Sequence, residues 1–173
     1  MSKIAVSMQD FLRTGEFGPV SLGLTRRQLR DCLGNPEDWG PYPKAEQHAA
    51  IWKYGDVEFF FHFQEDALGG IFADHIGTLK GGGAIDLDPW VLSGNLTVKQ
   101  ALRDFDGADI SCDRIDWTFD DTTERFRVGV GVELIFVDPR YDSDPEKELR
   151  PLAPADMTFH GFSHSASAKR VMP

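Results

Sequence analysis

One short pattern occurs twice in this chain. Residues 24–28, Leu-Thr-Arg-Arg-Gln, recur 72 positions later as residues 96–100, Leu-Thr-Val-Lys-Gln. A threonine followed three residues later by glutamine forms a capping box, which satisfies free amide groups at the start of a helix. A Val-Glu pair at residues 57–58 recurs 75 positions later at residues 132–133. Two matches at nearly one spacing indicate that the chain contains two copies of one structural unit.

Each copy is expected to begin with a helix. The first helix is predicted over residues 25–33, where apolar residues fall at helical spacing and Gly34 provides the stop. The second helix is predicted from Thr97 to Gly107, which ends it in the same way. A shorter helix is expected over residues 7–13, with a serine cap at its start.

Strands are expected after each helix, because aromatic and β-branched residues alternate there with polar ones. Their predicted ranges are 49–54, 57–63 and 70–76 in the first copy, and 112–119, 125–130 and 132–137 in the second. In the second strand, Glu58, Phe60 and His62 share the face opposite the apolar one, so both faces are expected to be partly covered. The pattern predicts an α+β fold, in which two related helix-plus-strands halves form one antiparallel sheet or two abutting sheets, with helices on one side.

The glycine run at residues 80–83, Lys-Gly-Gly-Gly, is the natural boundary between the halves. It lacks the strand–loop–helix context of a phosphate-binding loop, so we interpret it as a linker. The expected division is a first half over residues 1–80, a second half over residues 84–162 that shares a core with the first, and a polar tail over residues 163–173.

Composition limits the classes of partner. The chain has 173 residues and a formal net charge of −10. Binding to nucleic acid or to an anionic membrane needs clustered Lys and Arg, so neither partner is expected. Two cysteines are too few for a disulfide framework or a cysteine-rich metal site. With no secretion signal and no apolar run of membrane-spanning length, a cytoplasmic protein is expected.

Catalytic candidates are few. Glu58 and His62 share one face of a predicted strand, and His75 on the neighbouring strand could approach them. These three residues support an alternative hypothesis of a small metal-dependent or acid–base enzyme. Glu58 and Glu133 occupy equivalent positions in the two copies, which favours a structural role for both. We therefore expect a non-enzymatic protein with no metal and no cofactor.

Acidic residues concentrate in the second half. Four of them, Asp113, Asp116, Asp120 and Asp121, lie where Arg114 is the main opposing charge. They are either a solvated surface or a docking surface that accelerates encounter with a basic protein. Trp39 and Tyr42, in the loop after the first helix, are the candidate aromatic anchors for such a partner.

The motif that runs from Gly23-Leu24-Thr25 through Leu33-Gly34-x-Pro36 to Trp52-x-Tyr54-Gly55 resembles the repeat of the BamE/beta-lactamase-inhibitor-like fold. The resemblance spans residues 24–76 and 96–137. It implies that a short helical part packs on an antiparallel sheet, and that tandem copies build one concave sheet surface.

In composition, the chain is also similar to bacterial immunity proteins that neutralise polymorphic toxins. That likeness implies a small, acidic, cytoplasmic inhibitor that occludes the active or substrate surface of a cognate toxin. A purely structural or assembly module is a third hypothesis. The sequence leaves the partner and the oligomeric state open.

Overall fold

A computed structural model describes residues 3–41, 46–62, 64–74, 76–119, 121–140 and 152–166. These residues form three helices, α1 (Met8–Thr14), α2 (Arg26–Leu33) and α3 (Val98–Gly107). The first half contributes the strands β1 (Ile4–Ser7), β2 (Asp38–Gly40), β3 (Ile51–Tyr54), β4 (Val57–His62) and β5 (Ala67–Ala73). The second half contributes β6 (Ile85–Asp88), β7 (Cys112–Ile115), β8 (Thr123–Val128), β9 (Val132–Val137) and β10 (Thr158–Ser165). The predicted α+β class is confirmed.

The N-terminal helix caps are those expected from the sequence, whereas Gly107, the predicted stop, lies within α3 and Ala108 follows as its C-terminal cap. Thr25 accepts a hydrogen bond from the backbone N–H of Gln28 while the Gln28 side chain accepts one from the Thr25 N–H, and Thr97 and Gln100 repeat this arrangement. Ser7 caps α1, which ends at Gly15 in the left-handed conformation. No helix of the described ranges has both the length and the apolar character needed to cross a bilayer.

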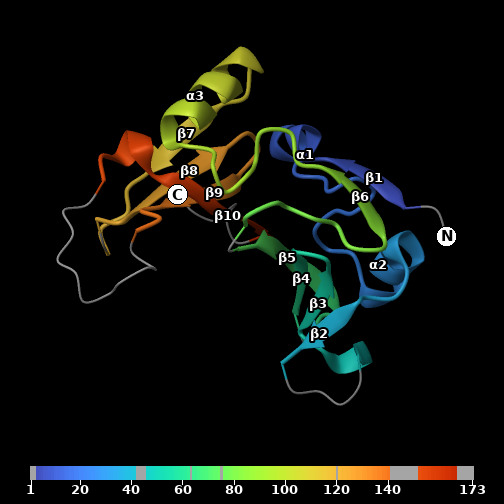
Figure 1. Cartoon of the computed structure of the whole chain (residues 1–173). Helices are drawn as coiled ribbons and strands as arrows, with labels where there is room; N and C mark the ends of the chain where they lie inside the picture. The colour runs from blue at the N-terminus through green and yellow to red at the C-terminus, as the bar shows by residue number, and fades with distance from the viewer. Residues whose placement is uncertain are drawn as a thin grey trace, which may run out of the picture.

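Eight strands form one antiparallel sheet in the order β2-β3-β4-β5-β10-β9-β8-β7. Each half contributes four consecutive positions, and β5 pairs with β10 where the halves meet (Figure 1). Read inward from either edge, the strands of each half follow one another in chain order, β2 to β5 from one edge and β7 to β10 from the other. This is the strand order of two copies related by a local two-fold axis.

The pairing register repeats in detail. In the first half, Phe60 pairs with Gly70 and the next pair, Phe61 with Leu68, skips one residue of β5. In the second half, the pair of Ile135 with Gly161 is followed by a pair that skips one residue of β10. The same β-bulge thus occurs at the same place in both copies. The strand order and the position of the bulge therefore repeat between the halves, as expected from the duplication that two short motifs predicted.

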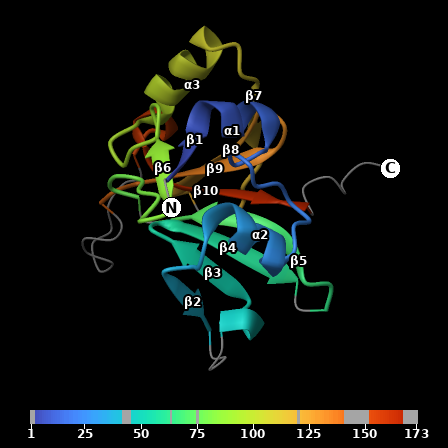
Figure 2. The same ribbon diagram turned by 90° about the vertical axis from the view of Figure 1, so that its right-hand side faces the viewer.

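The core lies on one face of this sheet. Figure 2 shows α1, α2 and the small β1–β6 sheet together on that side. Phe11 of α1 contacts Phe17 and Phe162 through edge-on rings with centroids 5.4 and 5.6 Å apart. Phe105 of α3 is buried in the same apolar cluster, which includes residues of both halves. The halves therefore share one core, and the helices lie on one side of the sheet.

The first strand of each half pairs with its counterpart. β1 and β6 are parallel, with Ile4 opposite Ile85. The glycine run between the halves packs against the turn that joins β3 and β4. There, Asp56 accepts a hydrogen bond from Lys80 N, and Glu37 accepts one from Gly83 N. The predicted linker is thus a loop held by hydrogen bonds.

Several predicted ranges differ from the structure. β10 extends to Ser165, so the polar tail expected from residue 163 begins after that strand; residues 167–173 lie outside the described residues. β10, β1, β2 and β6 were not predicted, because each is short or interrupted by small residues. The strand predicted over 112–119 ends at Ile115, and Phe119 is 83% exposed. Alternation alone could not distinguish a strand from the extended segment that follows it.

Candidate functional site

The sheet face opposite the helices, called here the outward face, carries a single row of eight paired residues. In sheet order from β2 to β7 the row is Asp38, Lys53, Glu58, Phe72, Ser163, Glu133, Arg127 and Asp113. Directly paired residues point to the same face of a sheet. Read inward from either edge, the row therefore begins with an acidic, a basic and an acidic residue. The uncharged residues Phe72 and Ser163 lie between these two groups of three.

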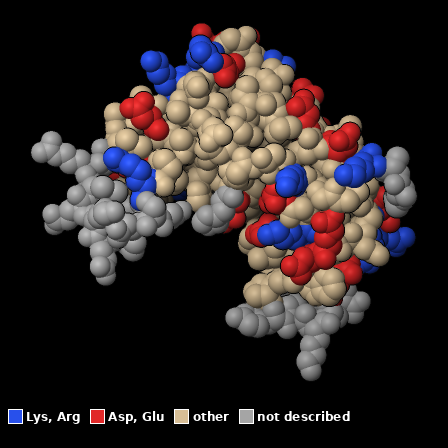
Figure 3. All heavy atoms as spheres, viewed as in Figure 1, with Lys and Arg blue, Asp and Glu red and all other residues tan. Residues whose placement is uncertain are grey.

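The charges in this row are paired across strands. Lys53 Nζ lies 3.2 Å from Glu58 Oε1 in the first half. In the second half, Arg127 Nη2 lies 3.6 Å from Glu133 Oε1, and Arg125 Nη2 lies 3.1 Å from Glu133 Oε2. All these side chains are half-buried or exposed. Figure 3 shows that the molecule is hollowed between the two halves, on the side away from the helices.

Aromatic side chains occupy the centre of the outward face in the first half. The rings of Phe60 and Phe72 have centroids 4.6 Å apart and both side chains are half-buried. A Cβ atom placed on Gly70 would overlap the Phe72 ring, and one placed on Gly69 would overlap the ring of His62. The two glycines therefore let these rings lie across the sheet surface. We call Phe60 and Phe72 the aromatic pair.

The second half has a different arrangement at the equivalent positions. Ile135 stands where the first half has Phe60, and Ser163 stands where it has Phe72. Its aromatic residue on this face is Trp117, and the guanidinium carbon of Arg125 lies 4.6 Å from the centroid of that ring. The outward face thus has the same carboxylates in both halves and different groups beside them.

The predicted docking residues are divided between the two edges of the sheet. Asp113 lies in the row on β7, and Asp116 and Asp121 are exposed in the connection from β7 to β8. Trp39 is 41% exposed on β2, at the opposite edge. Seven strand spacings of about 4.8 Å put the two edges roughly 30 Å apart. Tyr42 and Asp120 lie outside the described residues.

The structure therefore places Trp39 at the β2 edge, away from Asp113 at the β7 edge. A docking role for these residues stays a prediction. Arg114, expected to oppose the aspartates, instead donates to the buried carboxylate of Glu124, with Nε and Nη2 at 2.6 and 2.5 Å. Of the described acidic residues, Asp113 therefore lies on the outward face at the β7 edge, and Asp116 and Asp121 lie in the connection next to that edge.

The residues of the enzyme alternative do not form a cluster in the described part of the chain. Glu58 is paired with Lys53, and His62 is exposed at the end of β4 beyond the bulge. His75 lies outside the described residues. No group of three or more His, Cys, Asp or Glu residues with metal-binding geometry occurs among those described. Burial raises the pKa of the Cys112 thiol to about 11, so this thiol is protonated at neutral pH.

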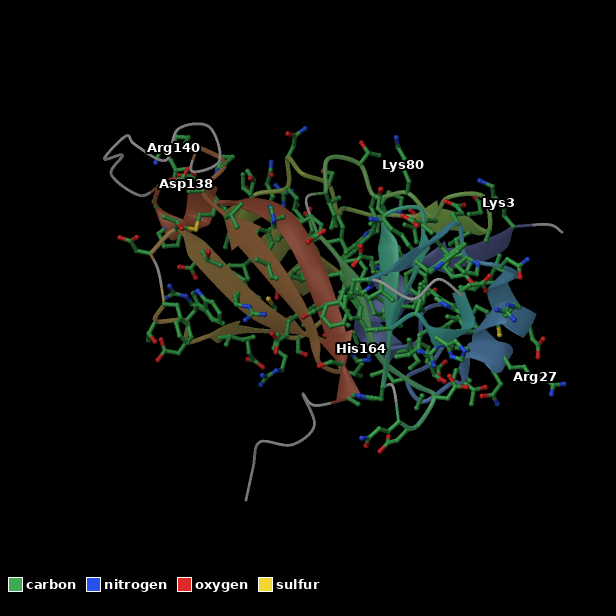
Figure 4. The ribbon with its side chains drawn as sticks, turned by 90° about the horizontal axis from the view of Figure 1, so that it is seen from below. Lys3, Arg27, Lys80, Asp138, Arg140 and His164 are labelled. Carbon is green, nitrogen blue, oxygen red and sulfur yellow. The ribbon has the colours of Figure 1, made fainter. Side chains whose placement is uncertain are left out.

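Cavities also occur around the helices and at the end of β10. One, of about 660 Å³, opens beside Arg13 between α1 and the end of α3. Another of the same volume borders Arg13 and Trp90. A further cavity, of about 470 Å³, lies between Gly15 and the end of β10, where the ring of His164 packs edge-on against Phe11. Figure 4 shows His164 where the halves meet, far from Asp138 and Arg140. Arg13, Asp106 and Asp109 line the first of these cavities, and Arg127 of the row lines the cavity at the end of β10.

Sequence reasoning missed Phe72 and Arg125 as surface residues. The signal that could have found them is the alternation around Gly69-Gly70, since adjacent glycines in a strand indicate that neighbouring rings or another chain approach the backbone closely. Comparison with protein-family models, with curated proteins and with solved structures found no match.

Proposed function

We propose that this protein is a non-enzymatic binding protein, and that it acts as an immunity-type inhibitor of a toxin by covering the toxin's active or substrate surface with the outward face. The observation that supports this most directly is the eight-residue row across the outward face, which has Phe72 at its centre, Phe60 beside it and charged residues on either side. Protein interfaces have this composition, an apolar centre surrounded by polar groups.

The charge of the chain supports a basic partner. The net charge is −10, and both ends of the row are exposed aspartates, Asp38 and Asp113. Negative charge at the edges accelerates encounter with a basic surface, while the apolar centre slows dissociation. One sheet built from tandem copies is also what the resemblance to the BamE/beta-lactamase-inhibitor-like fold implies, and membership of that fold is part of this proposal.

The test is co-production with the product of the neighbouring gene. Under the proposal, that product inhibits growth, this protein restores growth, and the two purify as a complex. Phe72→Glu places a charge at the centre of the row and should weaken the complex by more than about 30-fold, as expected for a central interface residue. Arg27→Glu, on the exposed side of α2, is the matched control and should bind normally (Figure 4).

A second measurement separates effects on the association rate from effects on the dissociation rate. Charge reversal of Asp113, Asp116 and Asp121 should lower the association rate, and the effect should diminish as salt is added. Normal binding by Phe72→Glu would contradict the assignment to the outward face. An association rate that is unchanged by the charge reversals would contradict steering by the β7 edge.

A further inference from the structure

The second half completes an aromatic, arginine and carboxylate arrangement within its own chain. The Arg125 guanidinium lies over the Trp117 ring and forms an ion pair with Glu133, with Nη2 3.1 Å from Oε2. A planar guanidinium suits both contacts, because its flat surface stacks on the ring and its N–H groups point at the carboxylate. Arg127 approaches the other oxygen of Glu133.

The first half has the equivalent carboxylate and lacks the arginine. Its aromatic rings stand at other positions, since Phe60 is equivalent to Ile135 and Phe72 to Ser163. Glu58 is equivalent to Glu133, and Lys53 is equivalent to Arg127. The position of Arg125 is taken by Ile51, which pairs with Phe60 as Arg125 pairs with Ile135. Among the described residues, Lys53 donates to Oε1 of Glu58 and no hydrogen bond reaches Oε2.

We propose that the aromatic pair and Glu58 form a subsite for an arginine side chain of the partner protein. This inference rests on the proposed function, because it names what the partner inserts at the centre of the outward face. The partner's guanidinium stacks on Phe72 and donates to Glu58 Oε2, and it thereby supplies in the first half the group that Arg125 supplies in the second.

Charge complementarity favours a cation at this place. The row contains four carboxylates, Asp38, Glu58, Glu133 and Asp113, and two cations, Lys53 and Arg127. Arg125 brings a third cation to the second half only. The excess of negative charge is therefore less compensated beside the aromatic pair than at the equivalent place in the second half.

An arginine fits this site better than a lysine. An ammonium group can approach a ring or a carboxylate as a compact charge, but it has no flat surface that stacks on the ring while an N–H group donates to the carboxylate. Ser163, which pairs with Phe72, has a small side chain, so no second ring stands beside Phe72 on β10.

The test uses N-acetyl-arginine amide as the probe, with N-acetyl-citrulline amide as its neutral isostere. Binding in the millimolar range should shift the NMR signals of the Phe60 and Phe72 rings, and the citrulline compound should shift them much less. Free L-arginine should bind no more tightly than the amide, because the site recognises a side chain of a protein. Equal shifts with the citrulline amide would overturn the proposal.

Three variants locate the site. Ile51→Arg supplies the arginine from within the chain, as the second half does, and should abolish probe binding. Phe72→Leu keeps an apolar side chain but removes the ring, and should weaken binding about fivefold. Glu58→Gln should weaken it by a similar factor. Ile135→Ala, at the equivalent of Phe60 in the second half, is the control and should bind the probe normally.

Each variant is checked for its unfolding midpoint, so that loss of structure is distinguished from loss of the site. A folded Ile51→Arg protein that binds the probe as the parent does would overturn the inference. If the probe binds as expected and the neighbouring gene product does not bind, the proposed inhibitor function is rejected and the arginine subsite is retained. If the affinity of the toxin complex is unchanged by Ile51→Arg and Phe72→Leu, the arginine subsite is rejected and the inhibitor function is retained.

Discussion

The two halves of the sheet share strand order, register and charge, and differ in what stands beside their central carboxylates. In the first half, Glu58 lies next to the aromatic pair, whereas in the second half Glu133 is held by two arginines of its own chain. The shared features are those that fix the backbone. The different ones lie on the outward face, where no packing against the core restricts the choice of residue.

The comparison teaches that a duplicated unit can keep its pairing rules while its exposed positions diverge. Cross-strand pairs such as Lys53 with Glu58 and Arg127 with Glu133 contribute to register in both halves. Phe60 and Phe72, in contrast, are replaced by Ile135 and Ser163 without any change in strand order. The strand order therefore does not require a ring at either position.

The largest expected difference between the halves is at two equivalent glycines. A Cβ at Gly161 would overlap the backbone carbonyl of Ala73, which cannot move without breaking the pair of β5 and β10. Gly161→Ala should lower the free energy of unfolding by on the order of 3 kcal/mol. The three atoms nearest to a Cβ at Gly70 all belong to the Phe72 side chain, which can change its rotamer more easily than a backbone carbonyl can move, so Gly70→Ala should cost about 1 kcal/mol.

Denaturant unfolding measures both changes, and Gly107→Ala provides a control because nothing lies within 4 Å of a Cβ there. Equal losses for Gly161→Ala and Gly70→Ala would show that the halves meet less closely than the structure indicates.

A smaller effect is expected where the second half is longer than the first. β4 and β5 are joined by residues 63–66, whereas 20 residues, 138–157, separate β9 from β10. Asp138 is the first residue of this connection and is 4% exposed. It accepts hydrogen bonds from the Arg140 side chain at 2.9 and 2.6 Å and from Leu152 N at 3.1 Å. Asp138→Asn should lower the free energy of unfolding by about 2 kcal/mol at neutral pH.

This effect should depend on pH. The hydrogen bonds from the Arg140 side chain lower the pKa of Asp138 below its usual value. Since the folded pKa is below the unfolded value of about 3.9, the carboxylate stabilises the fold fully above that value, and the stabilisation is lost as the pH falls through the folded pKa. Unfolding measured at pH 7 and pH 3 should show a smaller difference between parent and Asp138→Asn at pH 3. A constant difference would contradict the ion pair.

The helix caps should behave alike in the two halves. Thr25→Ala and Thr97→Ala each remove a capping box, and each should lower the free energy of unfolding by about 1 kcal/mol. Thermal unfolding of the two variants measures this, with Thr14→Ala at the end of α1 as a control for loss of a threonine. A loss confined to one helix would show that the two copies differ in their dependence on the cap.

The smallest effect concerns the paired charges of the row. Double-mutant cycles on Lys53 with Glu58 and on Arg127 with Glu133 should give coupling energies of about 0.5 kcal/mol, because all four side chains are partly exposed. Adding 0.5 M salt should reduce both. A much larger value in one half would show that its pair is shielded from water.

Much of this architecture could be predicted from residue order. The capping boxes at Thr25 and Thr97 and the strand at 132–137 required only local chemistry, and they occur as expected. β10 was missed because Gly161 and two serines weaken its apolar pattern, although it is the strand on which the halves join. A strand stabilised by partners on both sides does not need a strong pattern of its own.

Less of the candidate site than of the fold could be predicted from the sequence. Asp113 and Trp39 were chosen from runs of charge and from loop aromatics, and they lie on opposite edges of the sheet. Phe60 and Glu58 were correctly assigned to one face, but nothing in the sequence indicated that this face is free of helices. Which loop aromatics approach which acids depends on strand order, and strand order is a long-range property.

The sequence alone determined the local units: where each helix starts, which residues alternate across each strand, and that the unit occurs twice. These follow from hydrogen-bonding and periodicity within a few residues of one another. The tertiary structure decided that β5 pairs with β10, that the helices all pack on one face, and that Glu58 and Glu133 lie in a single row. Those outcomes require contacts between residues about 90 positions apart, whose free energy depends on the burial of a shared core rather than on any local pattern.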